Sequence, residues 1–454
     1  MKIKSLEYVR GRIKNVHPRT RKAQLNTIIG LVVKGSGMLI SLLLVPLTID
    51  YLSKEVYGTW LTISSIVTML MFLDIGIGNG LRNKFSEAVS KQEIRLARVY
   101  VSTSYFIFGI IQVGFILIFI TSFRFIPWQK IFNTTIDLDQ LQTVVLLTVI
   151  SMSVKLVLDI LSYVLFALQE SGQVGIINLL SNLFILVGTY ALSRSTDGNL
   201  IYLAIVTTGL PMITALFSGI ILYNNQLYVY RPSLRLADFK YAKNLLSLGY
   251  KFFFIQISAV VVFYADNLIV TQLFGPAEVT TYNVAFRYFN SFNTLFTIAL
   301  APYWSAFTEA SVKDDMEWIR QTHNRLQKLW IGLVILIPIM ILMADSVYQM
   351  WIGDRVKIPL QLNICMGLFC IVSSWNNIIA TVTNGLGKVK LQLYYALLAA
   401  SMNIPLAIFL GQKLKMGSAG VVLAATVSLL ICSIFGGIQV KRLVSGRATG
   451  IWNQ

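Results

Sequence analysis

Long runs of apolar residues, separated by short polar segments, follow one another along the whole chain. Each run has about 20 residues or more, the length at which a helix crosses a hydrocarbon core of roughly 30 Å. The runs are uniformly apolar and do not alternate with polar residues, so they predict helices and exclude a transmembrane barrel. We predict twelve spans, at residues 25–49, 59–81, 99–122, 143–168, 176–192, 200–223, 252–274, 282–307, 329–351, 360–384, 392–414 and 419–440.

Short sequence matches relate the first six predicted spans to the last six. The letters FSEA at 85–88 recur as FTEA at 307–310, EV at 55–56 recurs at 278–279, and GQV at 172–174 recurs as GKV at 387–389. The matches keep their order and fall at equivalent topological positions, which favours two six-helix halves, with chance similarity of common residues as the alternative. Because six is even, both halves insert in the same orientation, and a pseudo-twofold axis would follow the membrane normal.

The fold class predicted from this pattern is an all-α integral membrane protein in two six-helix bundles. Its expected parts are a basic arm, an N-terminal bundle, a linker, a C-terminal bundle and a tail, at residues 1–24, 25–223, 224–251, 252–440 and 441–454. The arm lacks a short apolar core with a cleavage site, so the first span reads as an uncleaved helix. Apolar residues at helical spacing in the arm predict an interfacial helix on the inner leaflet.

Composition and charge agree with a membrane protein. The chain is 56% hydrophobic and 13% charged, with a mean hydropathy of +0.68. Its net charge of +18 is distributed unevenly: of 38 Lys and Arg residues, 27 fall in the arm, predicted inner loops and tail, against 8 in outer loops. This positive-inside bias places both termini in the cytoplasm, so the charge reports topology and excludes nucleic acid as its partner. The basic inner loop 82–98 is expected to anchor on anionic lipid, or to attract the phosphates of a lipid substrate.

Six charged residues lie within the predicted spans, where charge is costly and often marks a substrate path. The bases are Lys34, Lys155 and Arg287, and the acids are Asp74, Asp159 and Asp266.

Two of these bases begin or continue polar stripes. Lys34 lies on a narrow polar face of the first span, and Arg287 is followed on one face of the eighth span by Asn290 and Thr294. We expect the Lys34 stripe and the Arg287 stripe to contact substrate, with Lys155 as a third candidate. Asp266 is expected near Arg287, as a structural ion pair or as a gate.

The remaining acids have simpler expected partners. Lys155 and Asp159 are four residues apart on one helix and should neutralise one another. Asp74 reads as a cation or proton site, or as a partner for Lys34 or for backbone exposed by the neighbouring glycines. Asp74, Asp159 and Asp266 are the candidates for ion coupling or gating. The glycines at 76, 78 and 80 indicate a hinge or close packing.

No catalytic constellation is apparent. The three cysteines lie inside predicted spans, and neither metal-ligand spacing nor a phosphate-cradling motif occurs. We therefore expect no enzyme activity, no cofactor and no metal. Any energy that the protein uses is expected to come from binding and from an ion or voltage gradient.

Several stretches resemble a known family. "YLSKEVYGTW" at 51–60, "FLDIGIGNGLRNKFSEA" at 72–88, "LQESGQVGIIN" at 168–178 and "TNGLGKVKLQL" at 383–393 are similar to the polysaccharide-transporter flippases. These are the O-antigen and capsule-unit translocases of bacterial inner membranes, in the MOP superfamily that also holds the MATE multidrug exporters and the lipid II flippase.

The resemblance implies a V-shaped, multi-pass inner-membrane flippase that works by alternating access. Its substrate would be an undecaprenyl-pyrophosphate-linked oligosaccharide for O-antigen, lipopolysaccharide, capsule or exopolysaccharide synthesis. Implied partners are membrane lipids, a polysaccharide polymerase and a chain-length regulator. Helices one and eight flank a lateral opening in related flippases, and here they carry Lys34 and Arg287. A cationic lumen suits a pyrophosphate.

Other functions stay open at this point. A multidrug or cation antiporter of the same superfamily would depend on the acids instead of the bases. A non-transporting scaffold for polysaccharide assembly would tolerate loss of Lys34 and Arg287. A membrane glycosyltransferase or ligase would need clustered carboxylates or a large outer loop, and the longest predicted outer loop, 123–142, is short.

Overall fold

The computed structural model describes residues 18–71, 77–241, 260, 262 and 264–453, and these ranges are helical without any strand. Residues 1–17 of the predicted arm lie outside them, and residues 18–24 form the first turns of α2. The long helices are α2 (Pro18–Tyr51), α3 (Lys54–Met71), α4 (Ile77–Ser90), α5 (Ile94–Ser122), α7 (Leu138–Leu158), α8 (Ile160–Ala167), α9 (Ser171–Ser195), α11 (Leu210–Asn224), α14 (Asp266–Phe274), α15 (Pro276–Val312), α16 (Met316–Ile352), α17 (Leu360–Gly385), α18 (Lys390–Ile408) and α19 (Ser418–Val444).

The predicted spans are confirmed as helices wherever the structure describes them. Nine helical segments in the described ranges have the length and composition to cross a membrane. The fourth predicted span is divided at Asp159 into α7 and α8, and the sixth contains the short α10 (Leu200–Ala204), a π turn at Ile205–Gly209 and α11. In the second predicted span, the described residues belong to α3, up to Met71, and to α4, from Ile77, and residues 72–76 lie outside the described ranges.

Side chains at the helix starts explain several boundaries. The Asp137 carboxylate accepts from the backbone N–H groups of Asp139 and Gln140, at 3.1 and 3.2 Å, where α7 begins. Asn199 accepts in the same way from Ile201, at 2.8 Å, before α10. These caps satisfy amide groups that have no carbonyl partner in the first helical turn.

Hydroxyl groups inside the helices are satisfied locally. Thr48, Thr148 and Thr426 each donate to the backbone carbonyl four residues earlier, at 2.6 to 2.9 Å. Such a bond removes the cost of an unpaired hydroxyl away from water. These helices therefore carry polar residues without needing a partner helix for them.

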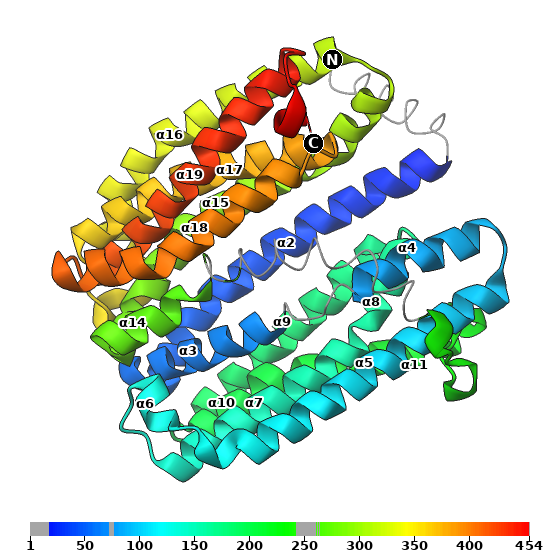
Figure 1. The fold of residues 1–454 in the computed structure, drawn as a ribbon. Coiled ribbons are helices and arrows are strands. Elements are labelled where there is room, and N and C mark those ends of the chain that lie inside the picture. Colours follow the sequence, from blue (N-terminus) through cyan, green and yellow to red (C-terminus); the bar gives the residue numbers. More distant parts are fainter. Residues whose placement is uncertain (1–17, 72–76, 242–259, 261, 263, 454) are drawn as a thin grey trace, which may run out of the picture.

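The helices form two groups (Figure 1). α3 to α11 make one group and α14 to α19 the other, with α2 between them and packed chiefly on α9. α17 is central in the second group, where it packs on α15, α16 and α19. Figure 1 shows the start of α2 and the end of α19 at one end of the molecule, here called the terminal end; α6 (Trp128–Phe132) lies at the other, the α6 end.

The outer surface is apolar. Leu342 and Met350 of α16 are 83% and 90% exposed, and Phe217 and Ile221 of α11 are each 58% exposed. Large apolar side chains facing outward over helix surfaces are the pattern of a protein whose solvent is lipid. The chain is a multi-pass membrane protein.

Candidate functional site

The two halves meet at the α6 end, where α3 packs on α14 and α15. We call this contact the seam. Its tightest point is Gly58, where a Cβ atom would lie 1.7 Å from the Pro276 carbonyl oxygen. Only glycine permits such a close approach of two backbones.

Polar side chains line the seam. The hydroxyls of Thr62 and Thr271 are 2.5 Å apart. Asn267 donates to the Ser65 hydroxyl at 2.5 Å and accepts from the Asn283 amide at 2.8 Å. Hydrogen bonds between membrane helices are individually modest, so they can hold such an interface together and still allow it to separate.

At the rim of the seam, Arg355 forms an ion pair with Asp50, with 2.7 Å between Nη2 and Oδ2. The Trp351 indole donates to the Leu42 carbonyl at 2.9 Å. These contacts fasten the end of α16 and the loop after it to α2. The residues of the pair are 38% and 50% exposed, so water weakens their attraction.

Arg287, a predicted substrate contact, joins α15 to α2. Its Nη1 donates to the Ser41 backbone carbonyl at 2.9 Å and also to the Ser41 hydroxyl. The expected ion pair between Asp266 and Arg287 is wrong, because the two side chains turn to different neighbours. Within the described residues, Arg287 has no carboxylate partner.

Asp266 is buried at the start of α14 and accepts from the Tyr282 hydroxyl at 2.5 Å. Its Oδ1 atom has no hydrogen-bond partner in the described part of the chain, and neither do Asn403 and Ser428, both fully buried. The Oδ1 atom of Asp266 is therefore a buried acceptor that no described side chain satisfies.

Asn403 and Ser428 face one another by register. Tyr395 of α18 contacts α19 near Gly436, and Gly411 contacts Gly420, which fixes the antiparallel alignment of the two helices. Asn403 lies eight residues from Tyr395, and Ser428 lies eight residues from Gly436. Because α14 packs on both helices, Asp266 belongs to the same helix cluster.

Lys34, Asn290 and Thr294 extend the Arg287 contact toward the terminal end. Lys34 lies two helical turns before Ser41, so it shares the face of α2 that Arg287 contacts, and its side chain is exposed. Asn290 and Thr294 are half-buried on α15, and the Thr294 hydroxyl donates to the Asn290 carbonyl at 2.9 Å. Lys34 has no ion pair among the described residues.

The pair of Lys155 and Asp159 is confirmed. Their charged atoms are 2.5 Å apart, and both side chains are partly buried. Each charge is neutralised within its own helix turn, as their spacing predicts. Lys155 thus has an acid beside it, whereas Lys34 and Arg287 have none in the described ranges.

Asp74 lies outside the described residues, as does Gly76. Of the other glycines in this stretch, Gly78 is closely packed, since a Cβ there would lie 2.1 Å from the Tyr163 ring. Close packing, one of the two expected roles, therefore accounts for Gly78.

An amide network in the second half escaped the sequence-based prediction. Asn293 of α15 donates to Ser373 and accepts from Asn377 of α17, each at 3.3 Å. Asn376 donates to Ser433 of α19 at 2.8 Å. Amides within lipid-spanning segments were the available signal, because each requires an internal partner. No cluster of three or more His, Cys, Asp or Glu residues with metal-site geometry occurs in the described ranges.

No family model matches the chain. Two curated proteins are similar to it. A protein of Yersinia pseudotuberculosis named "Putative O-antigen export protein" is 23% identical over 76% of this chain and 79% of its own length. A protein of Salmonella typhi named "Putative O-antigen transporter" is 21% identical over 63% of this chain and 64% of its own length.

Solved structures show the same fold. A MATE family multidrug resistance transporter of the MOP superfamily in an inward-facing conformation matches with a TM-score of 0.78 and 12% identity, over 93% of this chain and 98% of that one. An outward-facing structure of a MATE family transporter of that superfamily matches with a TM-score of 0.66 and 12% identity, over 93% and 96%. The resemblance inferred from the sequence motifs is confirmed by the names of the relatives and by the fold.

Proposed function

We propose that this chain, a membrane protein with the MATE transporter fold and with O-antigen transporters among its similar proteins, is a flippase for lipid-linked oligosaccharides. It moves undecaprenyl-pyrophosphate-linked repeat units across the bacterial inner membrane by alternating access, for O-antigen, capsule or exopolysaccharide synthesis. The lipid tail stays in the bilayer. The work requires no covalent chemistry on the substrate.

One observation carries this proposal: Lys34 and Arg287 have no carboxylate partner in the described residues, whereas Asp159 and Asp266 are each hydrogen-bonded. Cations without acids suit a diphosphate, because charge-assisted hydrogen bonds to phosphate oxygens are strong where water is scarce. A passage for cationic drugs would instead leave its carboxylates free. Lys155 is a weaker candidate for contact with the phosphates because it already forms an ion pair with Asp159.

The proposed cycle uses Arg287 as a movable contact. In the described conformation the Arg287 guanidinium donates to the carbonyl and hydroxyl oxygens of Ser41. When substrate enters between α2 and α15, a phosphate oxygen would replace these oxygens as the acceptor. Asn290 and Thr294 lie along the same face of α15 and would contact the sugar. Release requires the seam to separate, so each hydrogen bond across it is a gate contact that must break in every cycle.

Asp266 is the proposed coupling residue. Its unpaired oxygen, together with Asn403 and Ser428, offers oxygen ligands for a small cation or a place for a proton. The cation or proton would be bound at Asp266 in one conformation of the cycle and released in the other. Its binding and release would thereby couple transport to the gradient of that ion. Asp74 stays a second prediction, and Asp159 is less suited because Lys155 neutralises it.

The test is complementation of a bacterium that lacks its repeat-unit flippase. Wild type should restore surface polysaccharide, and Lys34→Ala and Arg287→Ala should reduce it at least tenfold at equal membrane abundance. Arg194→Ala, in a predicted outer loop, is the matched control and should retain activity. Restoration by both Lys34→Ala and Arg287→Ala at wild-type levels would contradict the phosphate-guided mechanism.

Two outcomes would favour the rivals. If wild type restores nothing with several repeat units but lowers accumulation of a cationic dye, the multidrug antiporter replaces the flippase. If the chain is a non-transporting scaffold for polysaccharide assembly, all charge variants restore polysaccharide, whereas deletion of the chain does not.

The coupling role of Asp266 has its own test. Asp266→Asn should abolish the gradient dependence of transport and leave substrate binding intact.

A further inference from the structure

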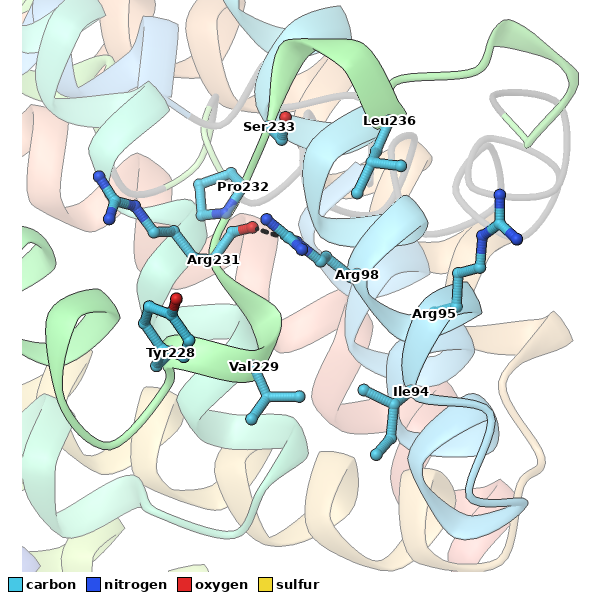
Figure 2. Close-up of a pocket in the computed structure, with 9 residues that line it drawn as sticks. All are labelled: Ile94, Arg95, Arg98, Tyr228, Val229, Arg231, Pro232, Ser233 and Leu236. Atoms are coloured by element: carbon cyan, nitrogen blue, oxygen red, sulfur yellow. Dashed lines mark hydrogen bonds between the residues drawn. The ribbon is translucent and has the colours of Figure 1, made fainter.

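The segment after α11 is fastened to the first half. Residues 225–241, here called the strap, cross the start of α5 (Figure 2). The Arg98 guanidinium donates to the Arg231 carbonyl at 2.8 Å, and the Ser233 amide donates to the Ser102 hydroxyl at 3.0 Å. The Asp238 amide donates to the Thr103 hydroxyl at 3.1 Å. Ser102 and Thr103 are buried, so the strap has a fixed place on the helix.

Of the three cavities that adjoin this strap, two share Arg231 and Pro232 in their walls. The first, the head cavity, has a volume of about 910 Å³ and lies between the strap and the first turns of α5 (Figure 2). The second, the chain groove, has a volume of about 250 Å³. It is lined mainly by apolar side chains of α11, with Tyr105 of α5 and Leu158 of α7.

The head cavity is cationic. Arg95, Arg98 and Arg231 line it, and no acidic residue does. None of the three forms an ion pair within the described ranges, although the Arg98 Nε is engaged with the strap. Figure 2 shows the Arg231 side chain directed away from Arg98, and Arg231 also lines the chain groove. Arg231 therefore lines both cavities, with its backbone carbonyl bound to Arg98 and its side chain directed away from Arg98.

The chain groove opens toward the bilayer. Leu216 and Ile220, which line the chain groove, are 42% and 48% exposed, as lipid-facing residues are. Gly219 forms part of the groove floor, and a Cβ atom there would meet nothing within 4 Å. An apolar trough that ends at an arginine at the edge of the membrane has the polarity of a phospholipid, with its chain in hydrocarbon and its phosphate at the interface.

We propose that the two cavities together bind one anionic phospholipid of the leaflet on the terminal side. An acyl chain occupies the chain groove, the phosphate contacts Arg231, and the anionic headgroup lies in the head cavity near Arg98. Arginine suits this role because its planar donors match phosphate oxygens. Among the described residues, the chain groove is lined by α5, α7, α11 and the strap, so the bound lipid is distinct from a substrate at α2 and α15.

This site does not depend on the flippase proposal, since it is measured by lipid retention without transport. The experiment uses the full-length protein in detergent, examined by native mass spectrometry after adding dioleoyl phosphatidylglycerol or dioleoyl phosphatidylcholine at equal concentration. Wild type should retain one phosphatidylglycerol at least fivefold more often than phosphatidylcholine. Equal retention of the two lipids would overturn the proposal.

Two variants address the two ends of the lipid. Arg231→Gln should lower retention of phosphatidylglycerol at least fivefold. Gly219→Leu places a side chain in the groove without striking the backbone, and should lower retention of both lipids. The matched controls are Arg325→Gln, an exposed residue of α16, and Gly114→Leu, on α5 outside the groove with open space at its Cβ. Neither control should change retention.

A free anion is the alternative that these variants separate. If inorganic phosphate displaces phosphatidylglycerol at millimolar concentration and Gly219→Leu has no effect, the site binds phosphate without a chain and the lipid proposal fails. Each variant must elute as a single species with the wild-type thermal midpoint in lipid-free detergent. If Arg231→Gln unfolds, Arg231→Lys replaces it, and retention equal to wild type would then contradict bidentate recognition of the phosphate.

Discussion

α2 and α15 meet differently along their lengths. Toward the α6 end, Arg287 binds Ser41, and the start of α15 lies directly against Gly58 of α3. Toward the terminal end, Lys34 is exposed on α2, and Trp304 of α15 is 50% exposed. The same two helices are thus joined in one place and accessible in the other.

The difference teaches which contacts define the conformation. At the joined place, hydrogen bonds and close backbone packing add to a buried apolar cluster that includes Val45 of α2, Trp60 of α3 and Val284 of α15. The seam is therefore the place where variants should alter transport most.

The largest effect is expected from Gly58→Leu. A side chain there overlaps the Pro276 carbonyl, so the seam cannot close as described. Since about 1.4 kcal/mol shifts a two-state population tenfold, a clash with backbone should reduce transport to background. Complementation at verified membrane abundance measures this, with Gly109→Leu as the control because its Cβ faces open space. Full activity of Gly58→Leu would mean that the seam never needs to close.

A reversible lock should give the next largest effect. The hydroxyls of Thr62 and Thr271 are close enough that cysteines at both positions should form a disulfide across the seam. Oxidation should stop transport, and reduction should restore at least half of it. The single variants Thr62→Cys and Thr271→Cys serve as controls, and the native cysteines are buried. Transport that continues with the bond formed would show that the seam does not separate.

A smaller effect is expected at the rim of the seam. Because both residues are largely exposed, the pair of Asp50 and Arg355 should contribute only about 0.2–1 kcal/mol. Asp50→Asn should change the transport rate less than about fivefold, and high salt should reduce the difference from wild type. Combining Asp50→Arg with Arg355→Asp should restore the wild-type rate. A complete loss of transport in Asp50→Asn would show that Asp50 does more than form a contact at the rim of the seam.

The smallest effect is expected at the terminal end, at Glu87 of α4. Hydrogen bonds from Lys91 and Lys84 lower the pKa of this exposed carboxylate from 4.5 to about 2. A lowered pKa stabilises the folded state above pH 4.5, and this contribution is lost as the pH falls toward 2. Thermal midpoints of wild type and Glu87→Gln should therefore differ by a small, constant amount from pH 5 to pH 8 and converge below pH 4.5. A difference that grows on acidification would refute this assignment.

Some features of the fold and site could be predicted because they are local. The apolar runs located the spans, and a four-residue spacing was enough to pair Lys155 with Asp159. Both depend only on the period of a helix, which a sequence displays directly.

Other features depend on how helices rotate against one another, and there the sequence was insufficient. Asp266 and Arg287 were expected to pair, but Tyr282 lies nearer to the acid and Ser41 lies nearer to the base. The network around Asn293 was missed because amides carry no charge to mark them. A single apolar run also concealed the division of the fourth predicted span at Asp159 into α7 and α8.

The threonine bonds within single helices have a consequence for how the protein is made. In a nascent helix such as α7, the Thr148 hydroxyl bonds to the backbone of the same helix. Such a helix can pass from the insertion machinery into the bilayer without a partner helix. α14 and α15 cannot do so at equal cost, since Asp266 and Arg287 find their partners on other helices. Biogenesis should therefore hold α14 back until α15 follows it, and hold α15 back until it reaches α2. The residues proposed for transport thus also set the order of assembly.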